Sequence, residues 1–553
     1  MGFVEVRLSK FKRIQLIKKN IFRYLKLNKI YPIDIYGVES MGVDEWLNNY
    51  YVPVTGKEFY AIYKNVLHAY ISILKEYDNE EVYWLAVSQL RLPILISRYI
   101  LEILRLFRLK EKGYGYILGQ KKEKIPEDIT TYEFTDPTIK NLIEKRISTL
   151  TPQERVKNIL RTIKYNILPE YLINKNFFKN ISKPYYIIGH RAQQEVVSFC
   201  RENEITPIHL PSIIFAKKSP VRMNNDLQYV EMMEFVMKFS TLVRKQHPIL
   251  GNSTFELLRM NIEECFRDSL FFLRQNIRVF SKYKPKNLLT TGLGNPIHRL
   301  FCSAWRCGGG EVIGITHGNS YCFGYTPETN FEISIPTHYI TYSRGHEKLV
   351  KQVKKDFSYG LRMSEITHFN QSFCYPIFKN LQKRPLVKKV KKIMIVGSVI
   401  KSYFVMNTEY HPFARLYNDI QLMKSLKKTG YSTIYKPRPG ILTEKKNVFE
   451  TYADRVLTDS FEDIYNYADC LLFSSPYSST FGFALLTNKP IVLINVEGYF
   501  WHPRVFELIK KRCSVVEAEA VDGKIIFEEK DVVNAVQESI NNINYDILNE
   551  FAF

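Results

Sequence analysis

Residues 467–490, YADCLLFSSPYSSTFGFALLTNKP, decide the fold of this chain because they predict a strand, a hydroxyl-rich turn and a helix in direct succession. The apolar strand ends at Phe473, and a helix that faces the core begins at Phe481. The turn between them offers hydroxyl groups at Ser478, Ser479 and Thr480. The first backbone amides of the helix point toward this turn. Such a turn suits a bound anion such as a phosphate. A plain strand-to-helix connection with serine caps explains this segment alone equally well.

A basic turn follows an earlier strand, in residues 432–440, STIYKPRPG. Lys436 and Arg438 emerge beside two prolines, which fix the backbone and stop any helix. An arginine can hold a phosphate through two parallel hydrogen bonds, whereas a lysine acts as a point charge. The turn is therefore a candidate anion site, and a solvated basic turn is the alternative.

A third strand, residues 391–398, KKIMIVGS, ends in Gly397 and Ser398, a turn able to admit a ligand. A helix at 414–428 follows it, and further strands and helices alternate up to the strand at 491–495. This alternation predicts a doubly wound α/β domain, in which the carboxyl ends of the strands line one crevice. Gly397, Arg438 and the serine turn are therefore expected to converge.

A second α/β pattern precedes the first, with strands at 287–292, 311–315 and 338–342 and a helix at 296–307. Residues 316–325, THGNSYCFGY, follow its middle strand. Histidine titrates near neutral pH, so His317 is a candidate general base or phosphate ligand. A structural histidine satisfied by backbone groups is the other interpretation.

These motifs together resemble the GT-B glycosyltransferases, and more narrowly the capsule and surface-carbohydrate biosynthesis transferases and the CDP-glycerol glycerophosphotransferases. The matching segments are 316–319, 436–440 and 474–490. In those families a Pro-His-Pro turn and a serine-rich turn hold the donor phosphates, and a His-Gly turn lies at the domain junction. This chain has Arg438 where the histidine is expected, and an arginine does not donate a proton near neutral pH.

The resemblance implies a GT-B-like α/β fold, with two Rossmann-like domains facing a cleft. We expect a basic, largely helical region over 1–120, an acceptor domain over 121–380 and a nucleotide-donor domain over 381–553. The donor would be a nucleotide sugar, and the acceptor a surface glycan or a lipid-linked glycan. Neither a cofactor nor a metal site is expected, because neither a DxD motif nor metal-ligand spacing is present.

The implied mechanism divides the work between two sets of residues. His317 would deprotonate the acceptor hydroxyl, while Arg438 and the donor-binding residues stabilise the leaving phosphate. The donor-binding candidates are Gly397, Ser398, Lys436, Arg438, Ser478, Ser479 and Thr480. Glu328 and Glu332, just past the His-Gly loop, are further candidates for a base or a sugar ligand, although surface acids are the favoured interpretation.

Two other polar pairs remain open. Glu462 and Asp463 stand where GT-B proteins often bind a base or ribose, but acids after Ser460 also make a good helix start, which we favour. Gly189 and His190 follow a predicted strand at 185–188 and are suited to touching the acceptor.

The chain of 553 residues carries a formal net charge of +22, which favours anionic partners. Residues 1–31 hold nine Lys and Arg and one acid, interleaved with apolar residues. They predict a basic amphipathic helix that either lies on an anionic membrane or packs on the protein. Residues 90–110 are apolar but interrupted by charges, which predicts a buried or interface-lying helix rather than a membrane span.

The eight cysteines are widely spaced, and neither a CxxC pair nor a secretory signal is visible. We therefore expect a cytoplasmic protein, which would be peripheral on the inner face of the membrane if residues 1–31 bind lipid.

Three functions remain in view. The leading one is a glycosyltransferase, with a CMP-activated acidic sugar as one candidate donor. A CDP-polyol phosphotransferase shares the phosphate-binding motifs. A non-enzymatic anion-binding protein is the outside alternative, although no nucleic-acid partner is expected, because the RNA-binding aromatic signature is missing.

Overall fold

The computed structural model describes residues 4–6, 29–32, 38, 41–49, 51–118, 185–188, 194–209, 227–283, 286–397, 412–437 and 446–553, apart from 319, 321, 326–328, 358–360, 363, 371, 373, 477, 497–499 and 522–523. The chain forms two compact units. Unit 1 comprises Met1–Tyr63, Ser97–Thr131 and Pro376–Asn549, and unit 2 comprises Lys64–Ile96, Tyr132–Tyr375 and Glu550–Phe553. Each unit contains one large sheet.

The sheet of unit 1 has seven strands in the order β12-β11-β10-β13-β14-β15-β16. All neighbours pair in parallel except β15 and β16, which are antiparallel. Numbered along the chain, the first six follow the order 3-2-1-4-5-6 of dinucleotide-binding folds. The strands are β10 (Lys392–Val396), β11 (Ser432–Lys436), β12 (Arg455–Val456), β13 (Cys470–Phe473), β14 (Ile491–Val496), β15 (Ser514–Val521) and β16 (Lys524–Ile526).

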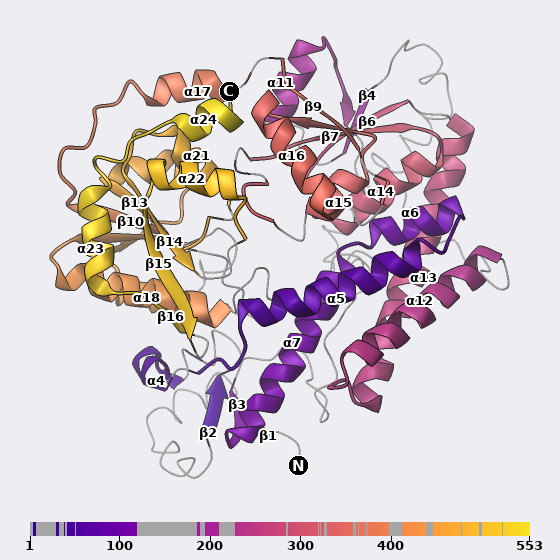
Figure 1. Ribbon diagram of the computed structural model, residues 1–553, viewed down its shortest axis with the longest axis horizontal. Helices are drawn as coiled ribbons and strands as arrows, with labels where there is room; N and C mark the ends of the chain where they lie inside the picture. Colours follow the sequence, from indigo (N-terminus) through magenta and orange to yellow (C-terminus); the bar gives the residue numbers. More distant parts are fainter. Residues whose placement is uncertain are drawn as a thin grey trace, which may run out of the picture. The chain divides into compact units, whose positions relative to one another are not determined.

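Helices surround this sheet (Figure 1) and explain why its central strands are apolar throughout. Every residue of β13 and β14 is buried, as expected for parallel strands covered on both faces. The predicted doubly wound arrangement is confirmed in this part of the chain. The helices are α17 (Cys374–Leu381), α18 (Pro412–Lys428), α19 (Lys446–Glu450), α20 (Phe461–Ile464), α21 (Ser479–Leu486), α22 (Pro503–Arg512), α23 (Glu529–Glu538) and α24 (Asp546–Phe551), with a 3-10 turn, η4 (Tyr465–Tyr467).

The sheet of unit 2 has six parallel strands in the order β5-β4-β6-β7-β8-β9. Along the chain this is 2-1-3-4-5, the flavodoxin-like order, extended by a sixth strand. The strands predicted from the sequence at 185–188, 287–292, 311–315 and 338–342 are all present. The strands are β4 (Tyr185–Ile188), β5 (Ile208–His209), β6 (Asn287–Thr291), β7 (Glu311–Ile315), β8 (His338–Thr341) and β9 (Glu365–His368).

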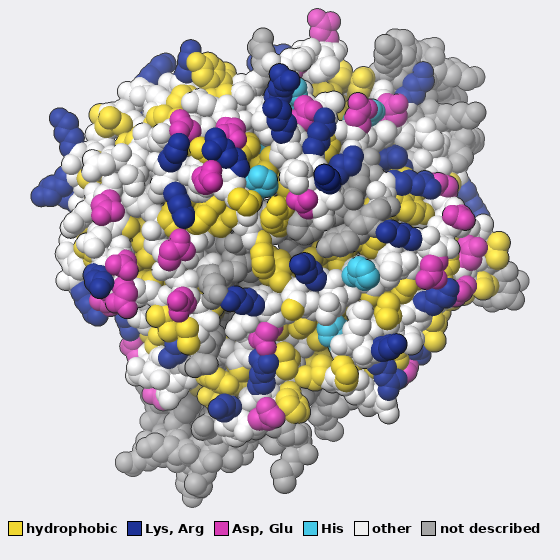
Figure 2. Space-filling view, viewed as in Figure 1, with side chains coloured by type: hydrophobic (Ala, Val, Ile, Leu, Met, Phe, Trp, Pro, Cys, Tyr) yellow, Lys and Arg dark blue, Asp and Glu magenta, His cyan; other side chains and the backbone are white. Residues whose placement is uncertain are grey.

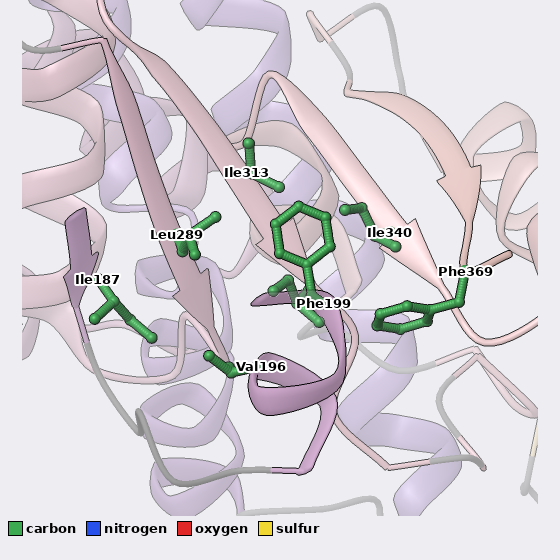
Figure 3. Close-up of a cluster of buried hydrophobic side chains, with 8 residues drawn as sticks. Ile187, Val196, Phe199, Leu289, Ile313, Ile340 and Phe369 are labelled. Atoms are coloured by element: carbon green, nitrogen blue, oxygen red, sulfur yellow. The ribbon is translucent and has the colours of Figure 1, made fainter. Parts of the chain in front are cut away.

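One face of the six-stranded sheet packs against helix α11 (Gln194–Glu202), as Figure 3 shows. The helix contributes Val196 and Phe199 to a buried apolar cluster. The strands and the segment after β9 contribute Ile187, Leu289, Ile313, Ile315, Ile340 and Phe369. This packing fixes the start of α11, which lies just beyond the carboxyl end of β4.

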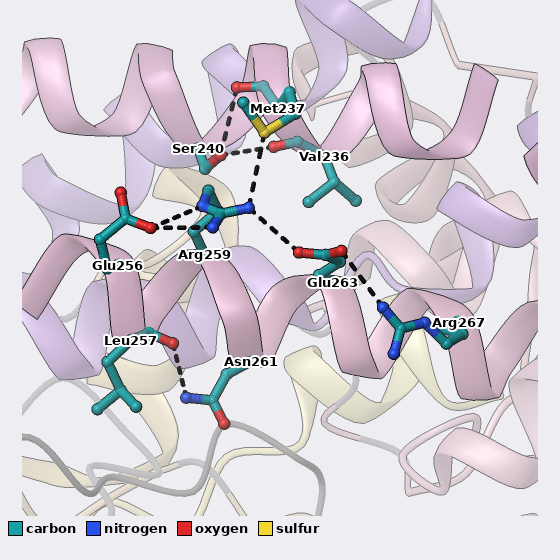
Figure 4. A network of polar contacts seen from close by, with 9 residues as sticks. All are labelled: Val236, Met237, Ser240, Glu256, Leu257, Arg259, Asn261, Glu263 and Arg267. Carbon is teal, nitrogen blue, oxygen red and sulfur yellow. Dashed lines mark hydrogen bonds and ion pairs between the residues drawn. The ribbon is translucent and has the colours of Figure 1, made fainter. Parts of the chain in front are cut away.

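The other helices of unit 2 include a long pair, α12 (Leu227–Gln246) and α13 (Asn252–Tyr283). Arg259 on α13 binds Glu256 and Glu263, and Glu263 also binds Arg267 (Figure 4). These are partly exposed pairs one turn apart, which contribute only modestly to stability. Unit 2 also contains α6 (Glu80–Ser88), α14 (Pro296–Cys307), α15 (Thr329–Ser334) and α16 (Arg344–Phe357).

The amino-terminal region differs from the expected helical extension. β1 (Val4–Val6), β2 (Lys29–Pro32) and β3 (Tyr114–Leu118) form a three-stranded parallel sheet in the order β1-β3-β2. The helix prediction for 1–31 is therefore wrong at both ends, because those residues pair with β3, and the residues between lie outside the described part. Three helices follow β2: α4 (Val43–Asn48), α5 (Gly56–Leu74) and α7 (Leu92–Glu111).

Helix α7 confirms the prediction of a helix over 90–110, and the structure adds that several of its charged residues are buried. Arg98, Glu102 and Arg105 are all buried. Burial raises the pKa of Glu102, against the opposing effect of Arg105, whose Nη2 lies 2.6 Å from the Glu102 carboxylate. Within the described ranges, no helix is both long and apolar enough to cross a membrane.

The charge of the protein is not concentrated in one place on the face shown in Figure 2. Lysine and arginine side chains lie there among acidic ones and do not gather into a single patch. On this face, the described residues form no broad basic surface for an anion.

We expect Phe199→Ala to destabilise the six-stranded sheet by about 3 kcal/mol or more, because it removes a large side chain from the cluster under α11. Hydrogen exchange of the β4 and β6 amides measures the effect locally. Val197→Ala on the same helix is the control, since Val197 is 52% exposed. Equal protection in the two variants would contradict the assignment of this core.

Candidate functional site

The carboxyl edge of the seven-stranded sheet brings together three segments that are far apart in the sequence. Val396 of β10 is paired with Lys436 of β11 on one side and with Phe473 of β13 on the other. Gly397, Pro437 and Ser474 therefore leave the sheet side by side. The strand order reverses between β10 and β13, and folds of this kind bind ligands beside such a switch point. Of the predicted meeting of Gly397, Arg438 and the serine turn, the register shows that Gly397 leaves the sheet beside the residues that follow β11 and β13.

Gly397 is required by packing at this edge. A Cβ atom there would collide with the hydroxyl group of Tyr435 and come within 2.6 Å of its Cζ. The Tyr435 hydroxyl donates a hydrogen bond of 2.8 Å to Asp419 on α18, and both side chains are buried. The space beside Gly397 that the sequence assigned to a ligand is thus filled, on this side, by Tyr435.

Lys436 is a buried cation at the end of β11, with only 4% of its surface exposed. Its Nζ donates a hydrogen bond of 2.8 Å to the carbonyl oxygen of Pro437. Burial lowers the pKa of Lys436, and the carboxylates of Glu462 and Asp459 oppose this effect. The sequence offered a solvated basic turn as the alternative, and the burial of Lys436 contradicts it for this residue. A bound anion would relieve the cost of this buried charge.

Ser478 is the N-cap of helix α21. Its Oγ accepts a hydrogen bond of 3.1 Å from the Phe481 amide, so the capping interpretation is confirmed for this residue. Ser479 is exposed and Thr480 half-buried, at the first two positions of the helix. Their amides and hydroxyls, rather than the Ser478 hydroxyl, are the groups that this turn offers to an anion.

Glu462 and Asp463 stand at the start of helix α20, as the capping interpretation requires. The hydroxyl of Ser460 does not cap the helix, however, but donates a hydrogen bond of 2.8 Å to the Asp463 carboxylate. Glu462 is exposed and contributes to the field at Lys436. Glu462 therefore belongs to the surroundings of Lys436, a relation that the sequence did not indicate.

Five candidates from the sequence lie outside the described residues. They are Gly189, His190, Glu328, Ser398 and Arg438.

The carboxyl edge of the six-stranded sheet carries His317, two residues after β7. Its Nδ1 lies 3.8 Å from Oε2 of Glu332 on α15, and the His317 side chain is 38% exposed. This separation suits an ion pair with a protonated ring but is too long for a hydrogen bond. The Glu332 side chain is only 7% exposed, so the interpretation of Glu332 as a surface acid is wrong. Helix α15, whose six residues are all buried, holds the carboxylate inside.

Two glycines with positive φ shape the backbone around His317. Gly292, just after β6, has φ 65°, and a Cβ there would lie 3.6 Å from the imidazole Cε1. Gly318 has φ 81°, and its amide donates a hydrogen bond of 3.3 Å to Oε1 of Glu195. The turn after β7 is therefore held from the neighbouring strand β6 and from the start of α11.

Glu195 and Tyr342 are two members of this edge that the sequence did not indicate. The Tyr342 hydroxyl donates a hydrogen bond of 2.9 Å to Glu195 Oε1. Burial raises the pKa of Tyr342 well above its usual value, and the Glu195 charge adds to the effect. The only local signal was an acid in the first turn of a helix that follows a strand, which is common in any α/β protein.

Within the described residues, the cysteines and acids form neither a disulfide nor a metal site. All eight cysteines are free thiols, and burial raises the pKa of Cys302 and Cys470 to about 12. Among the residues that the structure describes, no group of three or more His, Cys, Asp and Glu side chains is placed to hold a metal ion.

Comparison with known proteins gives only weak likenesses. No known protein family and no curated protein matches the chain. The crystal structure of Os79 from O. sativa in complex with U2F and trichothecene aligns with 66% of this chain and 92% of that one, at 10% identity and a TM-score of 0.32. KpsC of Thermosulfurimonas dismutans, a beta Kdo 2,7 transferase, aligns with 49% of this chain and 88% of that one, at 18% identity and a TM-score of 0.21. At such TM-scores neither likeness carries an argument about function.

We expect Lys436→Met to leave the ligand-free protein at least as stable as wild type at pH 7. Burial lowers the pKa of Lys436 in the folded state below its unfolded value of about 10.4. Above about pH 10.4 the lysine is neutral in both states, and its burial carries no charge penalty. As pH falls through the folded-state pKa the buried lysine becomes charged, and that stability is lost. The advantage of the variant should therefore shrink as pH rises toward 10. Thermal unfolding between pH 7 and pH 10 measures this.

The control for this measurement is Lys428→Met, because Lys428 is exposed and pairs with Glu529 on the surface. A Lys436→Met protein that is clearly less stable than wild type at pH 7 would show that the lysine serves the fold rather than a ligand.

Proposed function

We propose that the protein is a glycosyltransferase that moves a sugar from a nucleotide donor to a glycan acceptor. The observation that carries the proposal is the register of β10, which places a buried lysine and a hydroxyl-rich helix start at the switch point of a 3-2-1-4-5-6 sheet. The resemblance of the same motifs to surface-carbohydrate transferases supports sugar transfer. The donor domain is proposed to be 381–553, and the acceptor domain 121–380.

In this proposal the leaving phosphate is stabilised by fixed positive charge. Lys436 supplies a cation that is already desolvated, so its interaction with a phosphate is stronger than it would be in water. The amides at the start of α21 supply hydrogen-bond donors, and Arg438 is proposed from the sequence as a second cation. Such preorganised groups act on the charge that develops as the glycosidic bond breaks.

The acceptor hydroxyl would be deprotonated by His317. The buried carboxylate of Glu332, 3.8 Å from its Nδ1, stabilises the imidazolium that forms when the ring takes up the proton. The Nε2 atom is then the atom that faces the acceptor. Glu332 is a positioning residue in this scheme, because it acts through His317.

A thermal-shift panel of CMP, CDP, UDP, GDP and ADP tests donor binding. One nucleotide should raise the melting temperature of the wild type, because a ligand bound only by the native state stabilises it. Lys436→Met should lose most of that shift, and Lys428→Met should keep it. A panel in which no nucleotide stabilises the wild type would refute the proposal and favour a non-enzymatic anion-binding protein.

With the donor known, His317→Ala should lower kcat by about 10²- to 10⁴-fold while nucleotide binding stays unchanged, since general-base catalysis contributes that much. Glu332→Gln should cause a smaller loss and change the pH profile of kcat. His338→Ala is a matched control. His338 forms a similar pair with Glu365, at 3.2 Å, but it is the first residue of β8 and so lies at the amino edge of the sheet, away from His317.

Analysis of the product for phosphate separates sugar transfer from the polyol phosphate transfer that shares these motifs. Full activity of His317→Ala would remove the histidine from the mechanism.

A further inference from the structure

Helix α18 carries a buried arginine whose side chain lacks the partners that other buried arginines have. Arg415 is 4% exposed, and within the described part of the chain neither its Nε nor its Nη2 has a hydrogen-bond partner. Arg299 and Arg512, by contrast, are buried and donate to backbone carbonyls at 2.8 Å and 2.7 Å. A buried charge without a partner is costly, so Arg415 is out of place as a purely structural residue.

Asn418 is in the same situation one turn further along the helix. It is fully buried, and neither its Oδ1 nor its Nδ2 has a partner among the described residues. Residues three apart lie on the same face of a helix, so Arg415 and Asn418 face the same surroundings. Two adjacent polar side chains that are both buried and unpartnered point to a ligand rather than to an isolated packing defect.

The position of Asp419 on α18 locates Arg415 relative to the sheet. Asp419 accepts the hydrogen bond of Tyr435, whose hydroxyl lies against Gly397 at the end of β10. Since β10 and β11 are parallel, α18 runs back from the carboxyl edge of the sheet to its amino edge. Arg415, four residues earlier than Asp419, is therefore about 6 Å closer to the carboxyl side. Helical side chains also tilt toward the helix N-terminus, which carries the guanidinium further in that direction.

We propose that Arg415 and Asn418 form a buried subsite for an anionic group of the donor, a phosphate or a carboxylate, that offers two oxygens to the guanidinium. A guanidinium presents two parallel N–H groups that match two oxygens of either group, and the Asn418 amide can donate to the same anion. Lys436 is the last residue of β11, at the same carboxyl edge of the sheet, and supplies a separate point charge. The donor is thus expected to carry two anionic centres, as a nucleoside diphosphate sugar or a CMP-linked sugar acid does. This inference rests on the proposed function.

Isothermal titration of the full chain tests the subsite with CMP, CDP and CMP-N-acetylneuraminate as probes. Arg415→Met should weaken the binding of the probe whose anion occupies the subsite by about ten- to a hundredfold, the range for a hydrogen bond to a charged group. Its melting temperature without ligand should not fall. Arg415→Lys should recover part of the affinity, because it restores the charge without the fork. Lys428→Met, at the other end of α18, is the control and should bind as wild type does.

The probes distinguish the two sources of the anion. An equal loss with CMP and CDP assigns the first phosphate to the subsite, a loss with CDP alone assigns the second, and a loss confined to the sugar acid assigns its carboxylate. If Arg415→Met binds every probe as wild type does, the subsite is overturned, whatever happens to the melting temperature. If Arg415→Met does not fold, the titration is made with Arg415→Lys instead. An affinity of Arg415→Lys equal to that of the wild type would then overturn the subsite.

Failure of the subsite is distinguishable from failure of the proposed function. If the wild type binds no nucleotide, inorganic pyrophosphate is used as the probe in a thermal-shift measurement. Stabilisation of the wild type but not of Arg415→Met would keep the anion subsite and reject the nucleotide donor. No stabilisation of the wild type would reject both.

Discussion

The parallel pairing of β10 with β11 on one side and β13 on the other is the constraint on which unit 1 depends. It places Val396 opposite both Lys436 and Phe473, so three chain segments must leave the sheet at one level. The strands are apolar and buried on both faces, which leaves only the edge for polar groups. This register brings Gly397, Lys436 and Ser474 to one edge of the sheet, although they are far apart in the sequence.

The buried cations of this unit separate into two kinds. Arg512 donates to the carbonyls of Thr487 and Lys489 and so stabilises the connection between α21 and β14. Among the described residues, Lys436 donates to the carbonyl of Pro437, whereas Nε and Nη2 of Arg415 have no partner, and burial disfavours the charge of Lys436. A protein keeps a destabilising buried charge at a place where something else uses it, and both of these residues lie toward the carboxyl edge of the sheet.

Much of the fold was predictable because apolar periodicity is a local signal. The strands and helices at 287–292, 296–307, 311–315 and 414–428 lie where the sequence placed them, within two residues. Long-range pairing is not a local signal, and the amino-terminal prediction failed for that reason. The segments at the two ends, VEV at 4–6 and KIYP at 29–32, are short and mostly apolar, which suits a helix or a strand, and pairing with β3 decides for the strand.

Within the sites, the sequence by itself determined which chemical groups follow the strands: Gly397, Lys436, the serine turn and His317. Only the tertiary structure decided what surrounds them. Glu332 is buried beside His317, Glu195 joins Gly318 to Tyr342, and Nε and Nη2 of Arg415 have no hydrogen-bond partner among the described residues. The physical reason is that a strand end is encoded by neighbouring residues, whereas burial and partnership depend on elements that meet only when the chain is folded.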